Sequence, residues 1–462
     1  MRSLLLLATL FFMWGFLTSM NDILIPYLKE VFDLKHVGAM KVQTAFFGAY
    51  FVGSLLYFVI SAKFGDPIAR IGYQRGAVIG LLIAGGGALL FYPASVMLSY
   101  PLFLSALFTI GLGFTLLQIS ANPYVIAIGE EETASSRLNL CQGVNSLGTT
   151  LGPLIGGGLI LSLLGSKDDA GADAVRVPYL IFAGMLISLA VFFSFAKLPR
   201  ILPPGTVQRG ASVLRKPSVL LGMFAIFCYV GAEVSIGSIM IDYFGLEEIA
   251  GIEKSEASAY VALYWGGLMI GRFLGAVLAS SSSTSAKTIS VIGIPIAGFF
   301  LLAYMFSVSQ DTDYTATLVL LKPYALAMLL NLGAFALGAG KPARTIGVFA
   351  IVCVALLGVA ISQGGQIAFW SVIAVGLFNS IMWSNIFALS IQGLGKYQSQ
   401  ASSLLVMAIV GGALLPLLQG AHADDAGIQA SFVVPLVAYV YIAFYGLWGK
   451  SLGRGSDSAL IE

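Results

Sequence analysis

Charged residues are scarce in this chain. Lys, Arg, Asp and Glu make up 10% of its 462 residues, whereas hydrophobic residues make up 58%. The mean hydropathy of +0.92 excludes an ordinary soluble protein. A net charge of +2 offers no basic surface for nucleic acid. The three cysteines all lie in apolar stretches, so no disulfide framework is indicated.

The two histidines are predicted to lie in outer loops, which excludes a histidine proton relay inside the membrane. No metal-ligand cluster, nucleotide-binding loop or nucleophile–base pair stands out. We therefore expect neither an enzyme nor a protein with a resident cofactor.

Apolar stretches of about 20 residues, the length that crosses a bilayer, recur along the whole chain. They predict an all-α polytopic membrane protein with fourteen spans, at about 3–28, 40–62, 76–94, 101–128, 138–164, 178–196, 217–243, 258–279, 287–307, 316–339, 345–362, 366–391, 399–420 and 430–448. With the N-terminus inside, 16 basic residues fall at cytoplasmic ends and 7 in outer loops. This asymmetry predicts that both termini are cytoplasmic, in a protein of the cytoplasmic (inner) membrane.

A polar, proline-containing segment at 197–217 predicts a cytoplasmic linker after a six-helix bundle at 1–196. An ungapped shift of 263 residues aligns five pairs: Asn122 with Asn385, Ser136 with Ser399, Gly148 with Gly411, Pro153 with Pro416 and Gly157 with Gly420. The shift indicates two related halves. The second half would comprise 218–286, an inserted helix pair at 287–340, and 341–462. The open alternative is that one of the two inserted spans is re-entrant or lies at the membrane interface.

Amides line one side of the span at 138–164. Asn139, Gln142 and Asn145 are spaced at i, i+3 and i+6, which places them on one face of a helix. Amides are costly against lipid, so this face must meet protein or water. A polar seam in a duplicated membrane chain is typical of a secondary transporter.

Three of the charged residues within predicted spans, Asp22, Glu233 and Arg272, are candidates for function. Asp22 is expected to face a cavity or a cation, or else to end its span at the membrane interface. Glu233 lies near the middle of its span. It is expected either to bind a coupling cation or to form a structural ion pair with Arg272, and both alternatives stay open. The only metal ion that we expect these residues to bind is sodium, at Asp22 or Glu233.

Trp383 is the tryptophan best placed for a substrate. It lies mid-span beside Asn379 and Asn385. Aromatic rings stack on the apolar faces of sugars, although tryptophans also gather at membrane interfaces.

Several long motifs resemble the fucose–galactose–glucose:cation symporter family of the major facilitator superfamily. They are NDILIPYL, RIGYQRG, LQISANPYVIAIG, SRLNLCQGVNSLGTT, YVGAEVSIGS, GLFNSIMWSNIFALSI and MAIVGGALLPLLQG. The resemblance is closest to the glucose/galactose branch and covers nearly all the chain except 287–340. It implies the major facilitator fold, two six-helix bundles around a central sugar site, and coupling to an inward cation gradient. It also favours a monomer in the lipid bilayer.

The resemblance also implies roles for individual residues. Asp22 matches the first-helix aspartate linked to sugar recognition and protonation. Gln142 and Asn145 match fifth-helix amides that bond sugar hydroxyls, and Asn139 shares their face. Trp383 falls where the fucose transporter has a cavity tyrosine.

Two positions depart from the fucose branch. Gln118 replaces a fourth-helix glutamate and cannot carry a proton, and Glu233 replaces an amide. A fucose-type proton relay is therefore in doubt, and the coupling ion can be Na⁺ or H⁺. We expect a cation-coupled importer of a hexose such as glucose or galactose, with an uncoupled uniporter or effluxer as the alternative. In this hypothesis Asn379 and Gln118 join the substrate site, and Asp22 and Glu233 couple cation to sugar.

Overall fold

The structure is a computed structural model that describes residues 2–32, 36–164, 173–201, 212–252, 254–281 and 283–449. All regular elements in these ranges are helices. This is expected of apolar segments that must satisfy their own backbone hydrogen bonds. Among the described residues, twelve helices have the length and composition to cross a membrane, or thirteen with one bent pair. Helix α7 (Ala134–Leu164) adds a further helix of 31 residues. The predicted all-α polytopic fold is confirmed.

The contacts group the chain into two compact units. Unit 1 comprises residues 1–130, 147–215 and 391–413, and unit 2 comprises 131–146, 216–390 and 414–462. Each unit thus includes a segment from the other half of the sequence. Shifting 131–146 by the 263-residue repeat gives 394–409, which lies inside the segment 391–413. A helix can belong to one repeat and pack with the other, so the predicted division at 197–217 stays a prediction.

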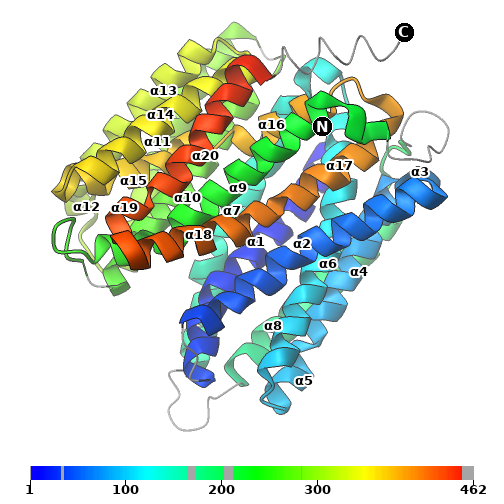
Figure 1. The fold of residues 1–462 in the computed structure, drawn as a ribbon, viewed down its shortest axis with the longest axis horizontal. Helices are drawn as coiled ribbons and strands as arrows, with labels where there is room; N and C mark the ends of the chain where they lie inside the picture. The colour runs from blue at the N-terminus through cyan, green and yellow to red at the C-terminus, as the bar shows by residue number, and fades with distance from the viewer. Residues whose placement is uncertain are drawn as a thin grey trace. The chain divides into compact units, whose positions relative to one another are not determined.

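Unit 1 is built around four long helices that run side by side in the order α2, α6, α4, α8 (Figure 1). Its helices are α1 (Arg2–Val31), α2 (His36–Phe64), α3 (Pro67–Ile71), α4 (Tyr73–Leu89), α5 (Phe91–Val96), α6 (Tyr100–Ala127), the second part of α7, α8 (Asp173–Phe195) and α17 (Gln398–Met407). Helix α17 packs on α2 and α6.

Glycines allow α4 and α6 to approach closely. A Cβ on Gly80 of α4 would lie 2.7 Å from the carbonyl oxygen of Gly113 and 2.8 Å from the amide nitrogen of Leu117. A Cβ on Gly87 would lie 2.6 Å from the amide nitrogen of Ile110. Small residues at such a crossing are how membrane helices gain packing contacts without a hydrophobic driving force.

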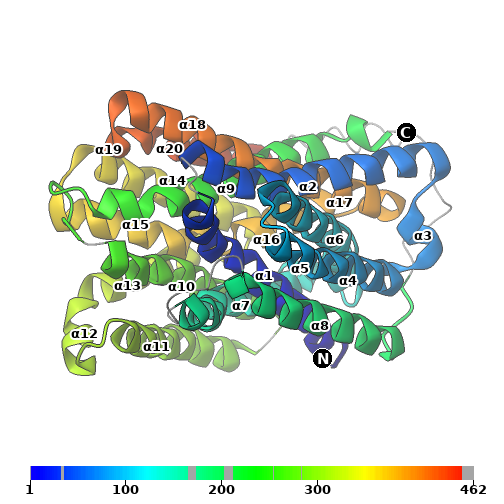
Figure 2. The ribbon, with the colours of Figure 1, turned by 90° about the horizontal axis from the view of Figure 1, so that it is seen from below.

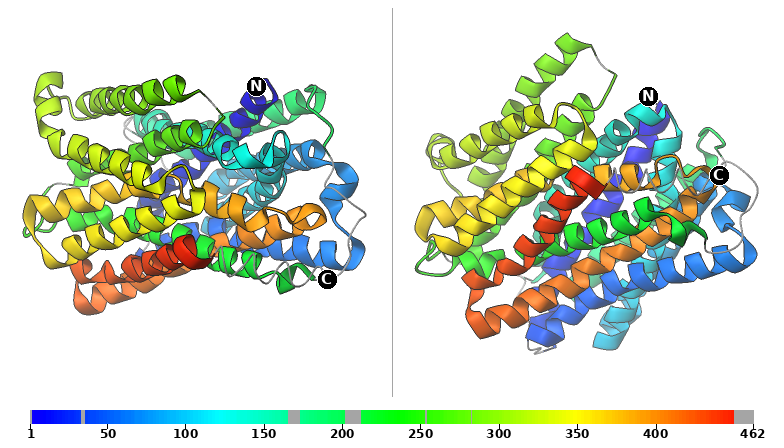
Figure 3. Two further views of the ribbon diagram at one scale, coloured as in Figure 1. Left: turned by 90° about the horizontal axis from the view of Figure 1, so that it is seen from above. Right: turned by 45° about the horizontal axis from the view of Figure 1, so that its top comes forward.

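Unit 2 contains the first part of α7 and most of the second half of the chain. Its helices are α9 (Pro217–Phe244), α10 (Lys254–Leu278), α11 (Thr284–Ser309), α12 (Tyr314–Leu320), α13 (Lys322–Gly338), α14 (Pro342–Ser362), α15 (Gly365–Asn379), α16 (Met382–Ile391), most of α18 (Gly411–Ala426), α19 (Ile428–Ser431) and α20 (Val433–Phe444). Helix α14 packs against α15 and α20, and Figure 3 shows α14 and α20 side by side.

Helices α11 to α13 form in the segment 287–340, where an inserted pair is predicted. Ser283 caps α11 by accepting a hydrogen bond from the Ala286 amide. Asp313 caps α12 in the same way, and its bonds from Thr315 and Ala316 lower the pKa of the Asp313 carboxyl. Helix α11 packs on α10 (Figure 2), and α13 packs on α14 and α15.

The single span predicted at 316–339 is instead two helices, α12 and α13, bent by 54°. Leu321 lies at the bend, and Pro323 follows it in the first turn of α13. Proline lacks an amide hydrogen and disfavours helical geometry in the preceding residue, which explains the break. That α11 to α13 are an insertion stays a prediction.

The close α4–α6 crossing generates a stability prediction. Gly80→Ala should lower stability by about 1–3 kcal/mol because the new methyl overlaps backbone atoms that cannot rotate away. Gly86→Ala on the same helix is the matched control, since a Cβ there meets nothing within 4 Å. Thermal unfolding in detergent should show a lower midpoint for Gly80→Ala alone. Equal midpoints for the two variants would contradict the packing account.

Candidate functional site

Buried polar side chains gather in unit 2 where α7, α9, α10 and α16 meet. The predicted span at 366–391 is interrupted there, because α15 ends at Asn379 and α16 begins at Met382. Ser380 and Ile381, between them, are 0% and 1% exposed. An interrupted helix exposes main-chain carbonyls to side chains and ligands, and such interruptions mark binding sites in transporters.

Arg272 joins three of these helices. Its Nε donates to the carbonyl oxygen of Ser380 at 3.0 Å, and its Nη1 donates to Ser146 Oγ of α7 at 2.5 Å. Its Nη1 also reaches the carbonyl oxygen of Gln142 at 3.4 Å. The guanidinium carries a permanent charge and five donors in a fixed plane, which suits it to bridging several acceptors at once.

Glu233 of α9 is the acidic partner of Arg272, at 3.8 Å between Oε1 and Nη2. The Glu233 side chain is 12% exposed and that of Arg272 is 6% exposed. The Tyr229 hydroxyl, one turn earlier on α9, donates to Glu233 Oε1 at 2.6 Å. Leaving either charge buried without its partner would be costly. The two charges therefore form an ion pair inside unit 2.

A chain of hydrogen bonds supports the backbone at Glu233. Tyr439 donates to Asn379 Oδ1 at 2.5 Å, and Asn379 Nδ2 donates to the Tyr264 hydroxyl at 2.8 Å. Tyr264 in turn donates to the carbonyl oxygen of Glu233 at 3.2 Å. Both ends of the Asn379 amide are therefore occupied. A substrate hydroxyl that bonded Asn379 would have to replace one of these two bonds.

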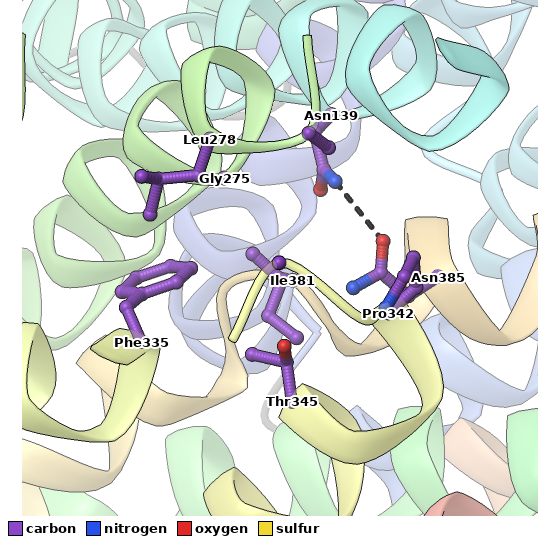
Figure 4. Close-up of a pocket in the computed structure, with 10 residues that line it drawn as sticks. Asn139, Gly275, Leu278, Phe335, Pro342, Thr345, Ile381 and Asn385 are labelled. Atoms are coloured by element: carbon purple, nitrogen blue, oxygen red, sulfur yellow. Dashed lines mark hydrogen bonds between the residues drawn. The ribbon is translucent and has the colours of Figure 1, made fainter. Parts of the chain in front are cut away.

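The three predicted amides of α7 are buried, with Asn139, Gln142 and Asn145 at 1%, 2% and 7% exposure. Asn139 Nδ2 donates to Asn385 Oδ1 of α16 at 3.1 Å, and Figure 4 shows the two amides facing each other. Gln142 Nε2 has no hydrogen-bond partner among the described residues. A buried donor without a partner is rare because its desolvation is not repaid, so a ligand or water is expected there.

A small cavity of about 50 Å³ lies beside the Asn139–Asn385 pair. The ends of α10, α13, α14 and α16 line it, with Gly275, Phe335 and Thr345 among the lining residues (Figure 4). A water needs roughly 10–15 Å³ of such space, so the cavity holds a few waters and not a hexose.

Trp383 lies in the first turn of α16 and is 7% exposed. Its ring packs edge-on against Phe387 at 5.0 Å between centroids. Both rings belong to α16, the helix that begins immediately after the interruption. The position is consistent with the stacking role predicted from the sequence, which stays a prediction.

Two further residues predicted from the sequence, Gln118 and Asp22, belong to unit 1. Gln118 is 1% exposed, and its side chain bonds the Tyr50 hydroxyl. The Gln118 Oε1 atom has no partner among the described residues. The backbone of Asp22 is part of α1, but its side chain lies outside what the structure describes.

Sequence reasoning missed most partners of Arg272 and Glu233. Tyr229 was detectable, because a residue four before Glu233 lies on the same helix face. Ser146 directly follows the predicted amide face. Nothing in the sequence signals that the carbonyl of Ser380 would bind Arg272, since the interruption contains neither proline nor glycine.

Comparisons with known proteins agree with this architecture. The sequence model described as Major Facilitator Superfamily matches residues 5–343. The Glucose/galactose transporter of Brucella abortus biovar 1 (strain 9-941) is 40% identical over 448 residues, which cover 96% of this chain and 93% of that protein. The L-fucose-proton symporter of Escherichia coli (strain K12) is 27% identical, covering 95% and 91% of the two chains.

A solved structure shares the fold. The crystal structure of the Major Facilitator Superfamily transporter FucP in the outward conformation matches with a TM-score of 0.73 and 25% identity, covering 96% of this chain and 98% of that one. The extent of the family match and the 40% identity to a full-length relative together establish the family. This chain belongs to the Major Facilitator Superfamily, whose members are multi-pass membrane transporters and not enzymes.

Proposed function

We propose that the protein imports a hexose such as glucose or galactose by alternating access, together with H⁺ or Na⁺. The protein would lie in the cytoplasmic (inner) membrane with both termini in the cytoplasm, and it would act as a monomer. The names of the relatives support a sugar substrate, and the name of one of them includes a proton. The 16-to-7 distribution of basic residues supports the orientation.

The observation that carries the proposal is the buried pair of Glu233 and Arg272 beside the interruption between α15 and α16. A neutral sugar needs hydroxyl partners but no buried carboxylate. A carboxylate near the middle of a membrane helix is costly, and a function such as cation binding would explain its presence there. Cation binding at Glu233 is the function that its chemistry suits.

The sugar partners would be neutral groups around this pair. Gln142 Nε2 is a buried donor that lacks a protein partner among the described residues, so a sugar hydroxyl would satisfy it at little cost. Asn145 and Asn139 lie on the same helix as Gln142. Gln118 of unit 1 is proposed as a further sugar ligand from the sequence alone. Trp383 would stack on the apolar face of the ring.

Coupling follows from the contacts of Arg272. A proton or sodium ion on Glu233 cancels the charge that attracts Arg272, and Arg272 also bonds Ser146 of α7 and the carbonyl of Ser380. Cation binding would therefore change the strength of the connection between α7 and α16. Asp22 would act with Glu233 in this coupling. Each ligand then raises the affinity for the other by the same factor.

Uptake of radiolabelled glucose and galactose into proteoliposomes tests the proposal, with sodium and pH gradients imposed separately. Sugar should accumulate above the external concentration with one of the two gradients, and that gradient identifies the ion. Equilibration that neither gradient drives uphill would establish the uncoupled uniporter instead. Absence of uptake for both sugars would contradict the hexose assignment.

Glu233→Gln should abolish uphill accumulation while sugar exchange across the membrane continues. Glutamine keeps the shape and an acceptor for Tyr229, but it neither binds a proton nor neutralises Arg272. Glu256→Gln is the control, because Glu256 is an exposed carboxylate at the start of α10. Uphill accumulation by Glu233→Gln at the rate of the control would assign the ion pair a structural role only.

Gln142→Leu should raise the KM for hexose about tenfold. This factor corresponds to the loss of roughly 1.4 kcal/mol, the contribution of one hydrogen bond. Protein stability should change little, because Gln142 Nε2 bonds no described residue. KM from initial uptake rates and the midpoint of thermal unfolding would be measured together. A lowered midpoint with an unchanged KM would place Gln142 in the packing and not in the sugar site.

A further inference from the structure

After its first residue, Lys322, helix α13 carries two buried polar side chains among apolar residues and glycines. Tyr324 and Asn331 are 1% and 2% exposed, whereas Leu329 and Leu330 on the same helix are 64% and 58% exposed. An amide in an apolar membrane helix must find a partner inside the protein. The partners of Tyr324 and Asn331 therefore show what this helix supports.

Asn331 bonds the main chain just before the interruption between α15 and α16. Its Nδ2 donates to the carbonyl oxygen of Leu377 at 3.1 Å. Ser380 Oγ donates to the same carbonyl at 2.7 Å. In a continuous helix this carbonyl would accept the amide of Ile381, four residues later.

The sequence at the interruption offers one weak local cause, the bond from Ser380 Oγ to the Leu377 carbonyl. Residues 377–383 read LFNSIMW, without proline or glycine, although these residues usually account for helix breaks. Side chains that insert into the hydrogen-bond ladder are the remaining cause. Asn331 bonds the ladder at Leu377 and Arg272 bonds it at Ser380.

Helix α10 is shaped to fit this interrupted segment. A Cβ on Gly267 would lie 3.0 Å from the Leu377 amide nitrogen and 3.1 Å from the Tyr324 hydroxyl. A Cβ on Gly271, one turn later, would overlap Ser380 Oγ. Helices α10, α13 and the interrupted segment thus form one tightly packed junction.

We propose that Asn331 is a positioning residue that holds the helix open at Ser380 by keeping the Leu377 carbonyl bonded to α13. The inference rests on the proposed sugar site, because Trp383 and the Arg272–Ser380 contact both lie directly at the interruption. It also gives α13 a function, which is to set the geometry of the neighbouring helix.

Hydrogen–deuterium exchange of the purified full-length protein tests the inference without a sugar. Asn331→Leu keeps the volume and removes the donor. The Leu377 carbonyl should then bond the Ile381 amide, and the peptide covering residues 379–385 should exchange more slowly than in the wild type. Tyr324→Phe is the matched control. It removes a 2.9 Å bond from α13 to the carbonyl of Leu263 on α10 and should leave this peptide unchanged.

Uptake kinetics provide the second readout. Asn331→Leu should raise the KM for hexose about fivefold, the effect of one neutral hydrogen bond, with little change in maximal rate. Ser380→Ala acts on the same carbonyl, so its effect on KM should not add to that of Asn331→Leu. The effects of Tyr324→Phe and Ser380→Ala on the KM should add, because the two side chains bond different carbonyls.

The outcomes separate the inference from the proposed function. Unchanged or faster exchange at 379–385 in Asn331→Leu would overturn the inference, whatever the protein transports. Slower exchange together with a wild-type protein that moves no hexose would support the inference and reject the sugar assignment. If Asn331→Leu does not fold, Asn331→Ser replaces it, since the shorter side chain cannot reach Leu377.

Discussion

The cost of burying charge in a membrane protein governs this site. Arg272 cannot lose its charge and lies 5% exposed among helices, so every acceptor near it must be used. The acceptors are Glu233 and Tyr229 of α9, Ser146 and the Gln142 carbonyl of α7, and the Ser380 carbonyl between α15 and α16. One permanent charge therefore determines how α7, α9 and α16 meet. Any process that changes the charge of Glu233 changes this arrangement.

The interruption between α15 and α16 follows from the same constraint. A carbonyl inside an intact helix already accepts one backbone amide, whereas an opened ladder leaves the whole carbonyl to a guanidinium. At Ser380 the ladder opens, and the two freed carbonyls bond Arg272 and Asn331. Glycines of α10 leave the space that this requires. Charge burial, helix interruption and close packing are thus parts of one arrangement.

The sequence predicts the helical spans well, because apolar length has a direct physical cause. It also predicts that Asn139, Gln142 and Asn145 face protein or water, since amides avoid lipid, and all three are buried. The bend at Leu321 is explained by Pro323, but no such signal marks Ser380. The hydrogen bonds at Ser380 and Leu377 come from residues 108 and 46 positions away. Only the folded chain shows these contacts. The sequence does indicate that Asn331, an amide in an apolar span, needs a partner inside the protein, but it does not identify that partner.

The central claim is that a cation on Glu233 and a hexose at the neighbouring amides stabilise the same state. Equilibrium binding of glucose or galactose to the purified protein, titrated across sodium concentration and pH, tests this most directly. The account predicts that one of these cations raises sugar affinity and that saturating sugar raises the affinity for that cation by the same factor. A sugar affinity independent of both sodium and pH would contradict it.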